Sequence, residues 1–148
     1  GAVFSNGFTY SGHPVACAAA LANMDIIDGE GLLEHAREVG PYLQQQLRTL
    51  ADLPIVGDIR GLGLMGCLEC VVSKKTRQPL ELDYEIGNRI DAHCQVLGLL
   101  VRPLINMCVM SPPIVISHGQ IDQMIGILRQ GIERTVEDLE REGVVCGS

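Results

Sequence analysis

Residues 7–14, GFTYSGHP, place hydroxyl side chains and glycines directly before an expected helix. Thr9, Ser11 and Gly12 could leave backbone N–H groups free, and the positive end of the helix dipole would favour a phosphate there. Hydroxyl residues before a helix more often serve as caps, and the spacing by itself favours the cap. The segment therefore indicates either a cap or a phosphate site.

Arg102 is the second candidate for a ligand-binding residue. It follows an apolar stretch, residues 98–101, that we expect to be a strand, and a lone cation beside apolar surface is costly unless an anion meets it. Its guanidinium offers two parallel donors that match a carboxylate. An exposed arginine at a strand end is the simpler interpretation from composition, so both remain open.

Three further patterns match ligand motifs but fit structural roles better. Residues 61–66 form G-x-G-x-x-G, yet the following residues favour a strand, where a dinucleotide fingerprint needs a helix. Cys67 and Cys70 would point to opposite faces of that strand. His13 and Cys17 have no third ligand nearby. We therefore predict packed thiols and no metal site.

No side chain is identified as catalytic. The chain has two lysines, Lys74 and Lys75, and both lie in a polar turn, whereas covalent amine chemistry needs a desolvated lysine. Asp58 and Arg60 would share one face of a strand beside the glycines, held by turn or backbone contacts. A structural and a functional role are equally consistent with that pair.

The elements that must position these residues follow from apolar periodicity. The pattern predicts an apolar first helix, buried on most sides, and a last helix that begins with a capping box. The expected order is a helix at 14–28, a helix at 32–50 that kinks or restarts at Pro41, strands at 55–60 and 64–73, a helix at 84–96, strands at 98–103 and 106–113, and a helix after Ser117 and Gln120. This order predicts an α+β fold: a small, largely antiparallel sheet with helices packed on one side, plus a long N-terminal helix.

Composition narrows the class of protein. The 148 residues carry a net charge of −7, which argues against nucleic acid or an anionic membrane as partner. No apolar run reaches the roughly 18 residues that a membrane span needs. The six cysteines lie mostly in apolar segments, so we expect reduced thiols in a cytoplasmic protein. Because Gly1 opens on a glycine loop without an initiator Met, we expect a piece of a longer chain.

Three stretches together resemble one family: FSNGFTYSGHPVACAAALANMDII, VGDIRGLGLMGCLE and GLLVRPLINMCVMSPPIVISHGQID. They are similar to the carboxy-terminal part of class III aminotransferases, which are fold type I enzymes that use pyridoxal phosphate. The similarity is greatest to the omega-amino acid:pyruvate branch, and it runs over nearly the whole chain in unbroken order.

The resemblance implies roles for particular residues. Thr9 would bind the cofactor phosphate of the neighbouring subunit in a homodimer, with the Phe8 main chain beside it, and Arg102 would pair with the substrate carboxylate. Asn6 departs from the family, in which histidine is common at that position. Residues 1–28 would be the last loop and connecting helix of the large cofactor domain, and residues 29–148 the small carboxy-terminal domain.

The resemblance also implies the reaction. The intact enzyme would move an amino group from an amine or amino acid to a keto acid such as pyruvate. The Schiff-base lysine would lie upstream, so we expect this chain to be inactive alone. The alternative is a non-catalytic α+β interaction module that binds a partner subunit through its first helix. Nucleotide binding through residues 61–66 ranks last and requires a helix after Gly66.

Overall fold

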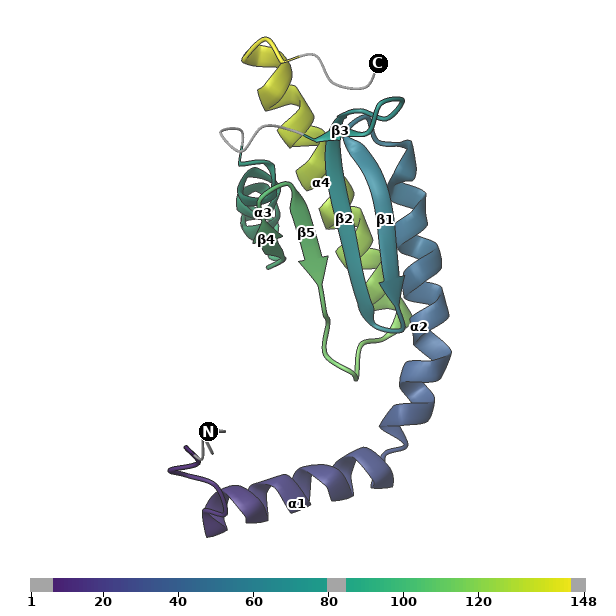
Figure 1. Cartoon of the computed structure of the whole chain (residues 1–148). Coiled ribbons are helices and arrows are strands. Elements are labelled where there is room, and N and C mark those ends of the chain that lie inside the picture. Colours follow the sequence, from purple (N-terminus) through teal and green to yellow (C-terminus); the bar gives the residue numbers. More distant parts are fainter. Residues whose placement is uncertain (1–6, 80–84, 145–148) are drawn as a thin grey trace. The chain divides into compact units, whose positions relative to one another are not determined.

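The computed structural model describes residues 7–79 and 85–144 (Figure 1). The helices are α1 (Pro14–Gly29), α2 (Leu32–Arg48), the short 3-10 helix η1 (Thr49–Asp52), α3 (Ile86–Val96) and α4 (His118–Arg141). The strands are β1 (Val56–Leu62), β2 (Met65–Ser73), β3 (Gln78–Pro79), β4 (Arg102–Leu104) and β5 (Met107–Met110). The chain divides into two compact units, Gly1–Glu34 and His35–Ser148.

The first unit contains α1 and the loop before it. The helix begins at Pro14, where a missing N–H costs nothing, and ends at Gly29 as expected. None of its residues is buried, and Val15, Leu21 and Met24 are 70%, 62% and 56% exposed. The prediction of a helix buried on most sides is therefore wrong for this unit by itself, because no other element of the unit covers the apolar side chains.

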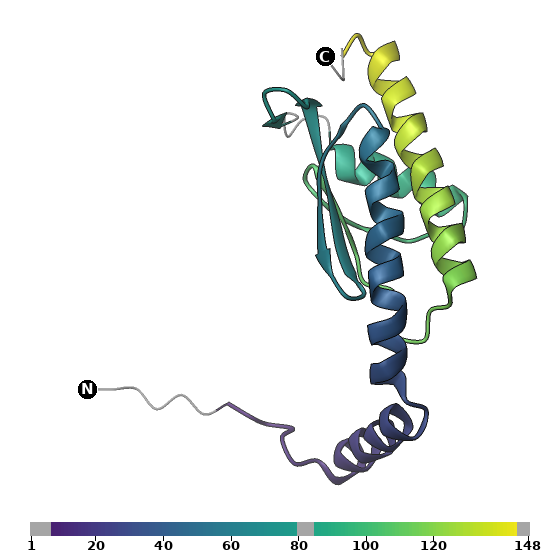
Figure 2. The same cartoon turned by 90° about the vertical axis from the view of Figure 1, so that its right-hand side faces the viewer.

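The second unit is built on an antiparallel sheet with strand order β1-β2-β5-β4, and β3 pairs with β2 outside that order. Figure 2 shows α2 and α4 along one face of this sheet. Residues of β2 alternate accordingly, so that Gly66, Leu68 and Cys70 are buried while Cys67 and Glu69 are only partly covered. The predicted α+β fold, with helices on one side of a small antiparallel sheet, is confirmed.

The core lies between the sheet and these helices. Leu43 and Leu47 of α2 and Leu128 of α4 are fully buried there. The helix α2 runs through Pro41 without a break, so of the two predicted outcomes, a kink or a restart, the restart is wrong. One lost helical hydrogen bond is outweighed because the leucines of the next two turns are anchored in the core.

Glycines join β1 to β2 in a tight hairpin. Gly61 pairs with Gly66, and Gly63 in the turn has a φ of +56°, which glycine adopts without strain. The side-chain amide of Gln44 donates to the carbonyls of Gly63 and Met65, both at 2.9 Å, and so fastens the turn to α2. Because Gly66 lies within β2 and the strand continues after it where the motif needs a helix, the dinucleotide motif is excluded and the structural role of these glycines is confirmed.

Packing accounts for three of the five cysteines that the structure describes, while Cys67 is only partly covered. Cys70, Cys94 and Cys108 are buried, and burial raises the pKa of the Cys94 thiol to about 11, so the thiol stays protonated at neutral pH. Cys17 is exposed, and Cys146 lies outside the described residues. No group of metal-ligating side chains is found in residues 7–79 and 85–144. None of the helices in those ranges has the length and apolarity of a bilayer span.

The predicted capping box is present at the start of α4. The Ser117 hydroxyl accepts from the Gln120 backbone N–H at 3.3 Å, and the Gln120 side chain accepts from the Ser117 N–H at 2.9 Å. Replacing Ser117 with alanine is expected to lower the free energy of unfolding by about 1 kcal/mol, because a helix N–H loses its partner. Urea unfolding of the chain measures this loss. The Ser117→Thr variant keeps the hydroxyl and should retain most of the stability; an equal loss in both variants would contradict the cap.

Candidate functional site

The loop before α1 is a pair of turns. The Ser11 N–H donates to the Phe8 carbonyl at 3.1 Å, the His13 N–H donates to the Tyr10 carbonyl at 3.2 Å, and Gly12 has a φ of +77°. These turns expose the Phe8 side chain and carry the chain into the first turn of α1.

The N-cap of α1 is His13, and its side chain makes no capping hydrogen bond. The hydroxyls of Thr9 and Ser11 therefore do not cap the helix, contrary to the interpretation that spacing alone favoured. Thr9 is exposed, and its hydroxyl makes no hydrogen bond to any of the residues that the structure describes. The arrangement can present a hydroxyl to an external acceptor near the positive end of a helix dipole.

Arg102 is the first residue of β4, an edge strand, rather than the end of a strand over residues 98–103 as predicted. The difference has a local cause. The Val101 N–H donates to the Asp91 side chain at 3.1 Å and the Leu99 N–H donates to the Cys94 carbonyl at 3.0 Å, so these groups bond to α3 and not to a strand. Pro103 fits β4 because an edge strand tolerates a missing N–H.

The Arg102 side chain is exposed and forms no hydrogen bond or ion pair within the described part of the chain. In the sheet, Arg102 pairs with Val109, Val109 with Cys67, and Cys67 with Arg60. Directly paired residues project to the same face, so these side chains form one row on the face away from α2 and α4. A free guanidinium on that face can bind a carboxylate through two parallel hydrogen bonds.

The two arginines of this row differ in their partners. Nη1 of Arg60 lies 2.7 Å from Oδ2 of Asp58 and 2.6 Å from Oε2 of Glu69, and these hydrogen bonds raise the pKa of Arg60. The sequence prediction of turn or backbone contacts missed Glu69, which the strand register places opposite Asp58. Arg60 is therefore held by this chain's own carboxylates, whereas Arg102 is open to a ligand.

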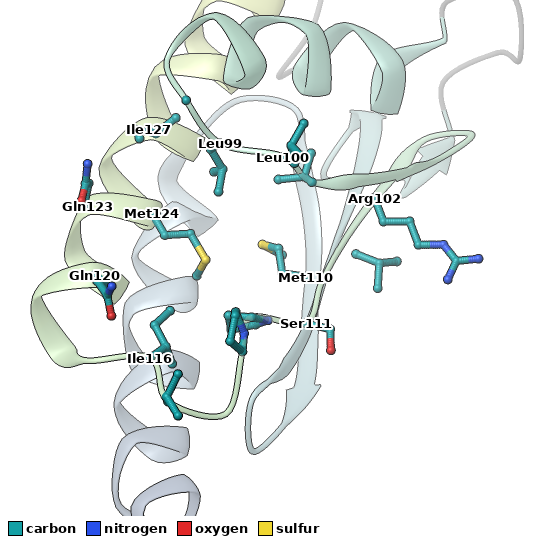
Figure 3. A pocket seen from close by; sticks show the side chains of 16 residues that line it. Leu99, Leu100, Arg102, Met110, Ser111, Ile116, Gln120, Gln123, Met124 and Ile127 are labelled. Carbon is teal, nitrogen blue, oxygen red and sulfur yellow. The ribbon is translucent and has the colours of Figure 1, made fainter. Parts of the chain in front are cut away.

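A pocket of about 600 Å³ lies beside Arg102, between α4, the residues before β4 and the residues after β5. Its lining is mainly apolar, with Leu99, Met110, Ile116 and Met124 among its residues, and among the described residues that line it Arg102 is the one charged side chain. Figure 3 shows the Arg102 side chain reaching away from Met110 and Met124. The guanidinium thus stands at the rim and does not point into the apolar interior.

The lysines lie at the surface, as predicted. Nζ of Lys74 donates to the Ala51 carbonyl at 2.6 Å, and both Lys74 and Lys75 are exposed. Neither is the desolvated amine that covalent cofactor chemistry requires. Neither lysine is therefore placed for covalent chemistry on a cofactor.

These features define the chain's class once it is compared with known proteins. The sequence profile of the family "Aminotransferase class-III" matches residues 2–132. The chain belongs to this family. The prediction of a class III aminotransferase is confirmed.

Two similar proteins are named as aminotransferases of putrescine and of gamma-aminobutyrate. The putrescine–pyruvate aminotransferase of Pseudomonas aeruginosa is 43% identical over 136 residues, which are 91% of this chain and 30% of that protein. Gamma aminobutyrate transaminase 1 of Solanum lycopersicum, a mitochondrial protein, is 37% identical over 142 residues, 94% of this chain and 28% of its own length. This chain therefore spans about 30% of the relatives that it matches.

Solved structures match the fold closely. A pyridoxamine phosphate (PMP)-bound aminotransferase from Vibrio fluvialis superposes with a TM-score of 0.85 at 36% identity, covering 91% of this chain and 30% of that one. An omega-aminotransferase from Paracoccus denitrificans superposes with a TM-score of 0.86 at 38% identity, covering 92% and 30%. The likeness to the omega-transaminase branch is thereby confirmed.

Proposed function

We propose that this chain is the carboxy-terminal part of a pyridoxal-phosphate-dependent aminotransferase, which transfers an amino group from an amine or amino acid to a keto acid such as pyruvate. The family match over residues 2–132 carries the proposal. The name of the Pseudomonas relative, which includes pyruvate, supports this acceptor. The same match disfavours the alternative of a non-catalytic interaction module.

The residues before α1 suit the cofactor phosphate. The cofactor would supply the electron sink that lets an amino group leave one carbon and join another. Thr9 would donate a hydrogen bond from its hydroxyl to the phosphate held by the neighbouring subunit, and the Phe8 main chain would lie beside that phosphate. The exposed loop and the adjacent helix N-terminus support these roles, since both favour a phosphate. Asn6, which departs from the family, lies outside the described residues.

Arg102 would bind the carboxylate of an amino acid donor or of the keto acid acceptor. Its guanidinium is exposed and unpaired within the described residues, while Arg60 in the same row is already held by two carboxylates. A bidentate pair would fix the orientation of a carboxylate, so that the reacting carbon is presented in one geometry.

The proposed assignment of residues 1–28 to the large cofactor domain and residues 29–148 to the small domain accounts for α1. Its uncovered apolar side chains would be buried against the remainder of the enzyme. We propose a homodimer in the cytoplasm: the described cysteines are free, and the proposed contact of Thr9 would be to the phosphate held by the neighbouring subunit.

The isolated chain is expected to have no transaminase activity, since both of its lysines are in an exposed turn. The measurement is alanine formation from pyruvate with an amine donor and added pyridoxal phosphate, together with the cofactor absorbance spectrum. The complete enzyme, with the preceding domain, should turn over under the same conditions. Cofactor-dependent amino transfer by the isolated chain would refute the proposal that the catalytic lysine lies in the preceding domain.

A further inference from the structure

The strand that carries Arg102 is attached at both ends to one helix, α3. At its far end, the Gly87 N–H donates to the Ile105 carbonyl at 2.9 Å. A Cβ atom at residue 87 would lie 2.7 Å from the Met107 carbonyl oxygen and 2.9 Å from that of Ile105. Glycine at this position therefore lets α3 approach the β4–β5 hairpin closely enough for that hydrogen bond.

Asp91 makes the attachment at the near end. Its Oδ1 accepts a hydrogen bond from the Val101 N–H at 3.1 Å, and its Oδ2 accepts one from Nε2 of Gln95 at 2.6 Å. Asp91 is half-buried on α3, and Gln95 is one helical turn further along the same helix. Because Gln95 occupies the second oxygen, the carboxylate is held with the first oxygen directed to Val101.

Val101 directly precedes Arg102, and it comes before the first strand pair, which joins Arg102 to Val109. Its N–H is therefore outside the ladder, and the Asp91 carboxylate is the group that binds it. A hydrogen bond to a charged acceptor is stronger than one to a neutral acceptor. A backbone N–H cannot follow a displaced acceptor by a side-chain rotation, so the backbone itself would have to move. The start of β4, and with it the Cα of Arg102, is therefore fixed by this contact together with the pairing of Arg102 and Val109.

We propose that Asp91 is a positioning residue for carboxylate recognition: by holding the Val101 N–H, it sets the place from which Arg102 reaches the substrate. Asp91 does not touch the substrate itself. The inference rests on the proposed role of Arg102, and the experiment separates the two.

The test uses the complete enzyme and two amino donors, one that carries a carboxylate and one that lacks it. Asp91→Ala removes the acceptor and is expected to raise KM for the carboxylate-bearing donor about tenfold, the effect of losing a charged hydrogen bond. The KM for the donor without a carboxylate should change less than about twofold, because Arg102 is not needed for it. Asp91→Asn keeps an oxygen acceptor and should restore most of the selectivity.

His93→Ala is the matched control. His93 lies on the same helix and loses one polar contact, the 2.7 Å hydrogen bond to Asp138, but that contact faces α4 and not β4. It is expected to lower stability without changing the ratio of the two KM values. Amide hydrogen exchange in the complete enzyme gives a second readout: Val101 should exchange faster in Asp91→Ala and at the wild-type rate in His93→Ala.

If Asp91→Ala leaves the ratio of the two KM values unchanged, the inference is overturned. Should Asp91→Ala fail to fold, Asp91→Glu keeps the charge but moves the oxygen, and the same shift in the KM ratio is expected. Arg102→Ala in the same assay distinguishes failure of the proposed role of Arg102 from failure of the proposed role of Asp91. If it also leaves the ratio unchanged, the proposed role of Arg102 fails; if it alone changes the ratio, only the role of Asp91 fails.

Discussion

Replacing Arg102 with alanine in the complete enzyme is expected to lower kcat/KM for a carboxylate-bearing donor about 100-fold. A guanidinium that binds a carboxylate through two charge-assisted hydrogen bonds contributes about 2–3 kcal/mol, and alanine loses both. A donor without a carboxylate should lose less than about threefold, since it makes no such pair. Steady-state kinetics with the two donors measures the difference.

Two variants control for indirect effects. Arg102→Lys keeps the charge but lacks the planar fork, so it should recover only part of the loss. Arg60→Ala removes the other arginine of the same cross-strand row, which is bound to Asp58 and Glu69. It is expected to lower stability while leaving donor selectivity unchanged. An equal fall for both donors in Arg102→Ala would mean that the residue acts through the fold and not through the substrate.

The second large effect is expected at Thr9. Thr9→Ala in the complete enzyme should weaken pyridoxal phosphate binding at least about tenfold, because a hydrogen bond to a charged phosphate is lost. Equilibrium dialysis against the free cofactor measures the dissociation constant. The variant should release its cofactor on dilution, whereas its rate at saturating cofactor should change less.

The neighbouring hydroxyls give matched controls for Thr9. Thr9→Ser keeps a hydroxyl and should bind the cofactor nearly as tightly as the wild type. Ser11→Ala removes a hydroxyl two residues away in the same exposed loop and should have little effect. If Ser11→Ala weakens cofactor binding as much as Thr9→Ala, the phosphate contact belongs to the loop as a whole and not to Thr9.

Most of the fold could be predicted from sequence because its signals are local. The capping box at Ser117 and Gln120 lies within one turn, and the hairpin at residues 61–66 is marked by its own glycines. The packed state of Cys94 and Cys108 follows from the apolar residues around them. For the cap and the hairpin, the deciding contacts lie close together in the sequence.

The features that could not be predicted depend on contacts between distant residues. The start of β4 at Arg102 is set in part by the bond from Val101 to Asp91, ten residues earlier and on another element. Glu69 is brought to Arg60 by the register of β1 and β2. The unbroken helix through Pro41 reflects packing of the turns that follow it. Spacing along the sequence contains none of this information.

The candidate site was predictable only in part. Residue types marked Thr9 and Arg102 as possible anion binders, but they favoured a helix cap and a plain surface arginine as the simpler alternatives. The structure removes the cap, because the N-cap of α1 makes no side-chain bond. The structure also shows that Arg60 is paired with two carboxylates, whereas Arg102 has no ion-pair partner among the described residues. Both residues are arginines, so residue type alone could not predict this difference.

The most direct measurement is a crystal structure of the complete enzyme bound to pyridoxamine phosphate and a keto acid. We expect the Thr9 hydroxyl within hydrogen-bond distance of the phosphate held by the other subunit, and the Arg102 guanidinium paired with the keto acid carboxylate. A phosphate bound entirely by other residues, with Arg102 still in solvent, would contradict the assignment of both anion contacts to this chain.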